Sequence, residues 1–182
     1  MTIDKVWEMD GALPMGMVLP GVTAADLARL KRWWWAEEMS DSPEAAMFKL
    51  SIHAWVLRLD GLNVLIDACN GNHKSRVVPF ADNLQTDWLE RLGKLGLDPE
   101  DIDLVLCTHL HADHVGWNTR LIDGRWVPTF PNARYVFSRK EYEHWRQDDA
   151  EKFHHNAFVD SVLPVVESGQ ADIVESDHVV NR

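Results

Sequence analysis

The stretch "VLCTHLHADHVGW", residues 105–117, places three histidines and one aspartate within six positions, directly after an apolar run. The run "DLVLC", residues 103–107, is typical of a buried strand, and functional side chains are common on the loops that leave a sheet. Imidazole nitrogens and carboxylate oxygens are ligands for zinc and similar divalent metals. The stretch therefore predicts a metal-binding loop at the end of a strand.

The spacing within this stretch favours two metals over one. His109 and His111 are two positions apart, so in an extended segment their side chains point the same way and can share one metal. Asp113 and His114 follow after a turn and could face a second metal beside the first. The alternative is that all four are solvated loop residues or part of a helix cap. If they bind metals, we expect the four side chains to converge in space.

Composition narrows the class of protein. The chain has 182 residues, 46% of them hydrophobic, enough to build a core, and a formal net charge of −11 that argues against a nucleic-acid partner. No apolar stretch approaches the roughly 20 residues of a membrane-spanning helix, and the start "MTIDKVWEMD" does not resemble a signal peptide. The two cysteines, Cys69 and Cys107, are interpreted as reduced thiols of a cytoplasmic protein.

Strand and helix patterns interleave along the chain, which indicates an α/β or α+β class. The first predicted elements are a helix over residues 22–39 capped by Thr23, two antiparallel strands within residues 47–71 joined at Asp60-Gly61, and a helix over 82–96. They are followed by a short capped turn with Pro99 at its first helical position, a strand over 103–107, a strand over 134–137 and a helix over 138–145 opened by a Ser138–Glu141 capping box.

These residues resemble the metallo-β-lactamase superfamily. "THLHADH" is similar to that family's signature, "NVLIDACNGNHK" to its strand that ends in an aspartate, and "GLDPEDIDLVLCTHLHADHVGW" and "GRWVPTFPNARYVFSRKEYEHW" to the elements around the signature. The resemblance covers about residues 40–150. It implies an αββα sandwich with a one- or two-metal site at its edge. We expect a single domain over residues 1–182 whose C-terminal part is missing.

The resemblance also implies a ligand set. By matching position, His109 and His111 bind the first metal, and Asp113 and His114 the second. The metals would be one or two Zn²⁺ ions, with Fe, Mn or Co as other divalent candidates. The family adds a third histidine, a bridging aspartate and a last histidine, and no turn like the family's Gly-His-Thr-Pro-Gly-His occurs here. Four histidines follow the motif, and only the last lies at a plausible distance: His144, His154, His155 and His178.

The implied activity is that of a metal-dependent hydrolase of the lactonase and organophosphate-hydrolase branch. Metal coordination lowers the pKa of bound water from about 16 to about 7, so a metal-bound hydroxide would attack a small ester, lactone or phosphoester. Asp113 could orient this hydroxide and pass a proton to the leaving group. Two alternatives stay open: a non-catalytic metal-binding fragment, and an iron-dependent oxidoreductase of the same fold. The second is disfavoured because its members resemble His-X-Glu-X-Asp where this chain has His111.

Other residues carry weaker signals. Asp67 could fix a ligand histidine or simply end its strand, and Cys107 is more typical of a small buried residue than of a ligand. Trp117 could touch substrate. The run of Trp33, Trp34 and Trp35 cannot face one side of a helix, so some must meet a loop, a pocket or a second subunit, and a homo-oligomer stays open.

A missing second sheet would have a visible consequence. In a two-layer sandwich each sheet buries one face against the other. We therefore expect the strands within "HAWVLRL", "NVLIDAC" and "DLVLC" to leave an apolar face open to solvent.

Overall fold

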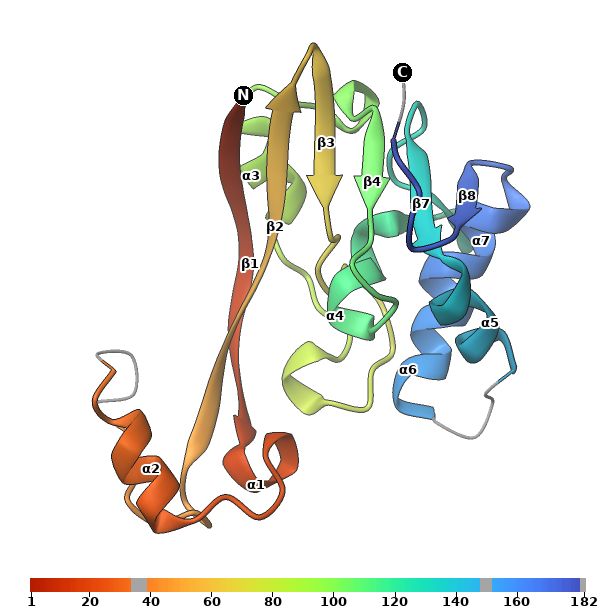
Figure 1. Cartoon of the computed structure of the whole chain (residues 1–182). Coiled ribbons are helices and arrows are strands. Elements are labelled where there is room, and N and C mark those ends of the chain that lie inside the picture. The colour runs from red at the N-terminus through yellow and green to blue at the C-terminus, as the bar shows by residue number, and fades with distance from the viewer. Residues whose placement is uncertain (34–38, 148–151, 181–182) are drawn as a thin grey trace. The chain divides into compact units, whose positions relative to one another are not determined.

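The computed structural model describes residues 1–33, 39–147 and 152–180 (Figure 1). Its internal contacts divide the chain into two compact units. The larger unit comprises Met1–Met9 and Ile52–Arg182, and the smaller unit comprises Asp10–Ser51. The expectation that residues 1–182 form a single domain whose C-terminal part is missing stays a prediction. In the described residues, no helix is long and apolar enough to cross a membrane.

The elements follow in the order of the labels in Figure 1. The strands are β1 (Thr2–Pro14), β2 (Met47–Leu59), β3 (Leu62–Ile66), β4 (Leu104–Leu106), β5 (Thr119–Ile122), β6 (Arg125–Pro128), β7 (Arg134–Ser138) and β8 (Ala171–Val174). The α-helices are α1 (Met15–Val18), α2 (Ala24–Leu30), α3 (Trp88–Gly93), α4 (Ala112–Val115), α5 (Arg139–Gln147), α6 (Lys152–Ala157) and α7 (Leu163–Glu167). Short 3-10 turns are η2 (Pro79–Ala81), η3 (Pro99–Asp101) and η4 (Gly116–Asn118), and η5 (Phe158–Val162) is a π-helical turn.

A six-stranded mixed sheet organises the chain, with the strand order β1-β2-β3-β4-β7-β8. Strands β2 and β3 pair antiparallel, and β3, β4, β7 and β8 run parallel. The turn between β2 and β3 uses Asp60 at φ 53° and Gly61 at φ 82°, the left-handed conformation that the Asp-Gly pair predicts for a tight hairpin. The α/β class is confirmed, and the parallel strands β3, β4 and β7 end at the same edge, where α4 begins (Figure 1).

The two faces of this sheet differ in burial. One row of side chains crosses the sheet in register and is completely buried: Val56, Leu65, Val105 and Tyr135. The adjacent row, on the opposite face, is apolar and only half-buried or exposed: Trp55, Ile66, Leu106 and Val136. Trp55 is 40% exposed. The expected open apolar face is therefore confirmed only in part, because Val64 and Leu104, two positions along on the same face, are buried.

The smaller unit has its own core, formed by Met15, Leu27 and Ala46. Helix α2 begins at the predicted cap, because Thr23 Oγ1 accepts a hydrogen bond from Asp26 N–H while the Asp26 carboxylate accepts from Thr23 N–H. The predicted helix over residues 22–39 was too long, because α2 ends at Leu30 and residues 31–33 form a turn; residues 34–38 lie outside the described residues. The predicted helix over residues 82–96 was also too long, because α3 spans only Trp88–Gly93.

Strand β1 and the hairpin β5–β6 were not predicted. Charged residues interrupt the apolar alternation of β1, whereas the hairpin carries a usable signal in Asp123 and Gly124, both at positive φ in the turn. The strands β4 and β7, the turn at Pro99 and helix α5 lie where they were predicted.

Candidate metal centre

The four side chains predicted as metal ligands lie together beyond the end of β4. The ring centroid of His109 lies 4.4 Å from that of His111 and 3.9 Å from that of His114. The carboxylate oxygen Oδ2 of Asp113 lies 3.4 Å from His114 Nε2. The expected convergence is confirmed. We call His109, His111, Asp113 and His114 the histidine cluster.

Local sequence explains this convergence. Leu110 is buried and anchors the loop, so the two histidines on either side of it point away from the core. His111 then takes an extended conformation, with φ −69° and ψ 158°, at the start of α4. Ala112 and Val115 bury the inner side of that helical turn and leave the intervening Asp113 and His114 half-buried.

Donor atoms of the cluster face protein partners. His114 Nε2 faces Asp113, and His109 Nδ1 lies 3.0 Å from Thr108 Oγ1. Across residues 1–33, 39–147 and 152–180, no three His, Cys, Asp or Glu side chains present the donor arrangement of a metal site. The donor types and their closeness fit a divalent metal, but side-chain rotations are needed to aim the nitrogens at one point. Their role as metal ligands stays a prediction.

Asp67 connects the end of β3 to the cluster. Its Oδ2 lies 2.8 Å from His114 Nδ1, and its Oδ1 accepts a hydrogen bond from Thr108 N–H at 2.8 Å. The residue has φ 59°, so the chain turns sharply here, and its carboxylate reaches Thr108 and His114. A carboxylate on Nδ1 leaves Nε2 as the nitrogen available to a metal.

Carboxylates control protonation within the cluster. Burial lowers the pKa of His114, but hydrogen bonds with Asp113 and Asp67 outweigh it and raise this pKa to about 9. Burial raises the pKa of Asp113, yet its bond with His114 brings the pKa below the ordinary value. Burial, with the charges of His114 and His111, lowers the pKa of His109. His114 thus carries a proton that a bound metal would displace.

Helix α5 supports the loop from the other side. Glu141 Oε2 accepts hydrogen bonds from Leu110 N–H at 3.0 Å and from Trp145 Nε1–H at 3.2 Å. The ring of Trp145 contacts that of His111 edge-on, with centroids 5.6 Å apart. Glu141 and Trp145 therefore restrain the backbone between the first two histidines.

The remaining candidates fall outside the cluster. Cys107 is buried beside Asn118, and burial raises the pKa of its thiol to about 12, which agrees with a small core residue. Trp117 was expected to touch substrate, but it is 4% exposed, stacks on Trp88 and donates its indole N–H to Glu8. That expectation was wrong, because the turn η4 directs Trp117 into the core.

Other histidines of the chain lie outside the histidine cluster. His178 is exposed after β8, where its backbone N–H donates to Glu175 O. His144 is exposed on α5, and His73 is exposed in the loop after β3. The side chain of His154 lies outside the described part of the structure, and His155 is half-buried on α6.

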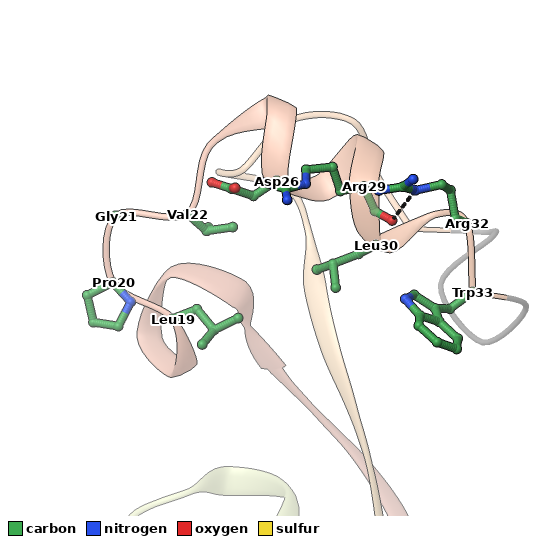
Figure 2. Close-up of a pocket in the computed structure, with 9 residues that line it drawn as sticks. All are labelled: Leu19, Pro20, Gly21, Val22, Asp26, Arg29, Leu30, Arg32 and Trp33. Atoms are coloured by element: carbon green, nitrogen blue, oxygen red, sulfur yellow. Dashed lines mark hydrogen bonds between the residues drawn. The ribbon is translucent and has the colours of Figure 1, made fainter.

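Trp33 lines a cavity of about 600 Å³ in the smaller unit (Figure 2). Figure 2 shows Leu19, Leu30 and Trp33 around it, with Arg32 Nε–H donating to Arg29 O at 3.3 Å. Trp34 and Trp35 lie outside the described residues. Of the three tryptophans expected to meet a loop, a pocket or a second subunit, Trp33 is thus observed at a pocket, and it is 61% exposed.

Sequence reasoning missed Glu8 and Glu141. Glu141 was assigned to a helix cap, whereas its carboxylate reaches the histidine loop. For Glu8 the sequence did carry a sign of burial. Glu8 follows Val6 at the two-residue spacing of a strand, so this charged residue falls on the inward face of β1.

Comparison with known proteins places this geometry in a family. Residues 47–180 match the model of the Metallo-beta-lactamase superfamily. The chain belongs to this superfamily. One curated relative is a probable metallo-hydrolase of Methanocaldococcus jannaschii, 33% identical over 97 residues, which span 50% of this chain and 41% of the relative. Another is the N-acyl homoserine lactonase AttM of Azorhizobium caulinodans, 42% identical over 50 residues, 28% of this chain and 16% of that protein.

Solved metallo-beta-lactamase structures share the fold. A probable metal-dependent hydrolase from Staphylococcus aureus superposes with a TM-score of 0.71 at 20% identity, covering 96% of this chain and 58% of its own. The dizinc quorum-quenching lactonase AidC, in complex with a product, superposes with a TM-score of 0.68 at 16% identity, covering 98% of this chain and 59% of its own. The chain therefore spans less than two thirds of the length of these relatives.

Proposed function

We propose that the natural protein is a metal-dependent hydrolase of small molecules and that the histidine cluster holds its metals. The observation that carries this proposal is the convergence of three imidazoles and one carboxylate within a few ångströms at the end of β4. Membership of the metallo-beta-lactamase superfamily supports it. Divalent metals bound there, with Zn²⁺ as the first candidate, would activate water and polarise the substrate's electrophilic oxygen.

Each member of the cluster has an assigned task. His109 and His111, on one extended segment, would hold the first metal, and Asp113 and His114, on the turn that follows, the second. Asp67 orients His114 through Nδ1 and so fixes the nitrogen that faces the metal. Further ligands would complete both coordination shells.

Asp113 also suits proton transfer. It is half-buried, lies beside His114 and keeps a pKa below its ordinary value, so it is an anion at neutral pH. A carboxylate in this position can accept a proton from water and deliver it to the leaving group.

The substrate class is an ester, lactone or phosphoester. Lactones come first, because the relatives of similar sequence include the N-acyl homoserine lactonase AttM and the structural neighbours include the lactonase AidC. A formal charge of −11 disfavours polyanionic substrates such as nucleic acids, because it repels their phosphates.

The test is metal analysis of the natural full-length protein, followed by a substrate panel. We expect at least one divalent metal per chain and turnover of a lactone, an ester or a phosphotriester. A chelator should abolish this turnover, and added Zn²⁺ should restore it. Absence of metal, or metal-loaded protein inactive on the whole panel, would contradict the proposal. Oxygen uptake with an iron absorption band would favour the oxidoreductase alternative.

A further inference from the structure

Glu8, on β1, is a buried carboxylate whose partners lie far along the chain. Its side chain belongs to a residue 2% exposed. Oε2 accepts a hydrogen bond from Asn70 N–H at 2.8 Å, and Oε1 accepts from Gly71 N–H at 3.2 Å and from Trp117 Nε1–H at 2.7 Å. In the described part of the chain no cationic side chain forms an ion pair with it. Its carboxyl group is therefore held by three N–H donors, and the Thr86 hydroxyl also donates to Oε1, at 3.5 Å.

Those N–H groups come from the two segments that carry Asp67 and His114. Residues 67–71 leave β3, and residues 114–118 run from α4 into η4. Backbone hydrogen bonds also join the segments: Ala68 N–H donates to His114 O at 2.7 Å, and Trp117 N–H donates to Ala68 O at 2.6 Å. Glu8 thus bridges the segment 67–71 and the segment 114–118, and we call the place where these segments meet the junction. The first segment carries Asp67 and the second carries His114, and the side chains of these two residues are joined by a hydrogen bond.

The junction is too tight for side chains. A Cβ on Gly116 would lie 1.8 Å from Asn70 O, and one on Gly71 would lie 2.6 Å from the carbonyl carbon of Gly116. Gly71 also has φ +76°, which favours glycine. Such contact turns the N–H groups of Asn70 and Gly71 away from the opposite segment and into the core, where they need an acceptor. Glu8 supplies it.

A carboxylate meets this need better than a neutral side chain. It offers two oxygens and no donor, so it can accept all three N–H groups at once. An amide of the same shape would bring its own N–H₂ against one of these N–H groups and leave donors unpaired in the core. The arrangement therefore requires a glutamate in particular, and not only a side chain of that size.

We propose that Glu8 is a positioning residue for the hydrolytic site: it holds the Asp67 segment against the His114 turn and thereby sets the hydrogen bond between Asp67 and His114 Nδ1. This inference rests on the proposed function for its catalytic consequence. Its structural half, the dependence of the His114 Nδ1–H bond on Glu8, stands on the contacts alone.

The test compares Glu8→Gln with Val6→Ala in the natural full-length protein. Val6 lies on the same strand and is 1% exposed, so its truncation loosens the core near Glu8 without removing the acceptor. In metal-free protein labelled with ¹⁵N-histidine, we expect the His114 Nδ1–H proton to exchange with solvent about tenfold faster or more in Glu8→Gln. In metal-loaded enzyme we expect kcat to fall about 10- to 100-fold at unchanged KM. Val6→Ala should alter neither.

Two results would overturn the inference. One is exchange of His114 Nδ1–H and kcat both at wild-type values in Glu8→Gln, and the other is an equal change in Val6→Ala. If Glu8→Gln does not fold, Trp117→Phe replaces it, since it removes one donor to Glu8 and keeps the stack on Trp88. A smaller acceleration of exchange would then support the inference, and wild-type exchange would overturn it. A protein that hydrolyses nothing but shows the exchange effect would refute the proposed function alone.

Discussion

The larger unit gathers charge in two places, and they differ in what surrounds them. The histidine cluster is half-buried, and its polar atoms face one another across short gaps. The second group, Lys74, Arg76 and Asp160, which we call the buried ion cluster, is almost wholly buried. Arg76 pairs with both oxygens of Asp160, at 2.7 and 3.0 Å, and Lys74 Nζ donates to Thr119 Oγ1 at 2.8 Å and lies 3.6 Å from the centroid of Trp126.

Because of this difference, we assign metal binding to the histidine cluster and stabilisation of the fold to the buried ion cluster. In the buried ion cluster the contacts join the loop at residues 74–76, the β5–β6 hairpin and the turn η5, so its charges stabilise the fold. In the histidine cluster burial, together with the charges of His114 and His111, lowers the pKa of His109, which favours the neutral imidazole that a metal can bind. Variants of the buried ion cluster should change the stability of the protein. Variants of the histidine cluster should change its metal content and activity.

The largest expected effect is on activity. His111→Ala in the natural full-length protein should lose one metal and bring turnover below detection, because the first metal keeps only His109 from this segment. Thermal stability of the metal-free protein should barely change, since His111 is half-buried at a loop edge. His144→Ala, exposed on α5, is the control for removal of a histidine. Full metal content in His111→Ala, measured by elemental analysis, would contradict the ligand assignment.

The largest expected effect on stability comes from the buried ion cluster. Asp160→Asn leaves two cations buried without their carboxylate and should cost about 3–5 kcal/mol of unfolding free energy. The turnover number of the folded enzyme should stay at the wild-type value. Asp172→Asn is the matched control, because its ion pair with Arg134 is exposed and worth about 1 kcal/mol or less. Denaturant unfolding measures both, and equal losses would erase the distinction between the clusters.

The same contrast explains how much the sequence could predict. Four cluster residues lie within six positions, so their convergence depends on one loop and was readable from the motif. Strands β2, β3, β4 and β7 were readable because their apolar patterns are local. Glu8 and Asp160 were not readable as buried groups, since their partners lie 62 and 84 residues away and only the fold brings them together.

Asp67 stands between these two cases. Its place at the end of β3 is local, and the sequence left a ligand-fixing role and a strand end both open. The hydrogen bond to His114 spans 47 residues and appears only in the structure. The length of α2 was misjudged for a related reason: helical propensity over residues 22–39 gave no sign of the turn after Leu30.

An intermediate effect is expected at Asp67. Asp67→Asn should lower metal affinity or kcat about 10- to 100-fold, because the uncharged amide no longer favours the proton on His114 Nδ1. Metal titration and steady-state kinetics of the full-length protein measure both quantities. Asp82→Asn, whose carboxylate accepts from Arg76 N–H, is a control for loss of a loop carboxylate elsewhere. Wild-type metal affinity and kcat in Asp67→Asn would contradict the assignment of Asp67 as the residue that orients His114.

The smallest expected effect, counted per pH unit, is on the pH dependence of the unfolding free energy. Burial lowers the pKa of Lys74 from 10.5 to about 7, although Asp160 acts to raise it. Between these two values the unfolded chain binds one proton more than the folded protein, so stability should rise with pH. The slope from this group approaches about 1.4 kcal/mol per pH unit. Below pH 7, Lys74 is protonated in both states and adds no slope.

Lys74→Met tests this pH dependence and the assignment of the buried ion cluster to the fold. Methionine keeps an apolar stem beneath Trp126 and carries no proton, so the unfolding free energy of Lys74→Met should lack the rise that wild type shows between pH 7 and 10. The quantity to compare is the slope, measured by urea unfolding at several pH values, because a constant offset from lost hydrogen bonds cancels in it. Parallel curves for the two proteins would contradict the lowered pKa of Lys74. They would mean that Lys74 keeps its proton up to pH 10 in the folded protein, because Asp160 offsets the effect of burial on this pKa.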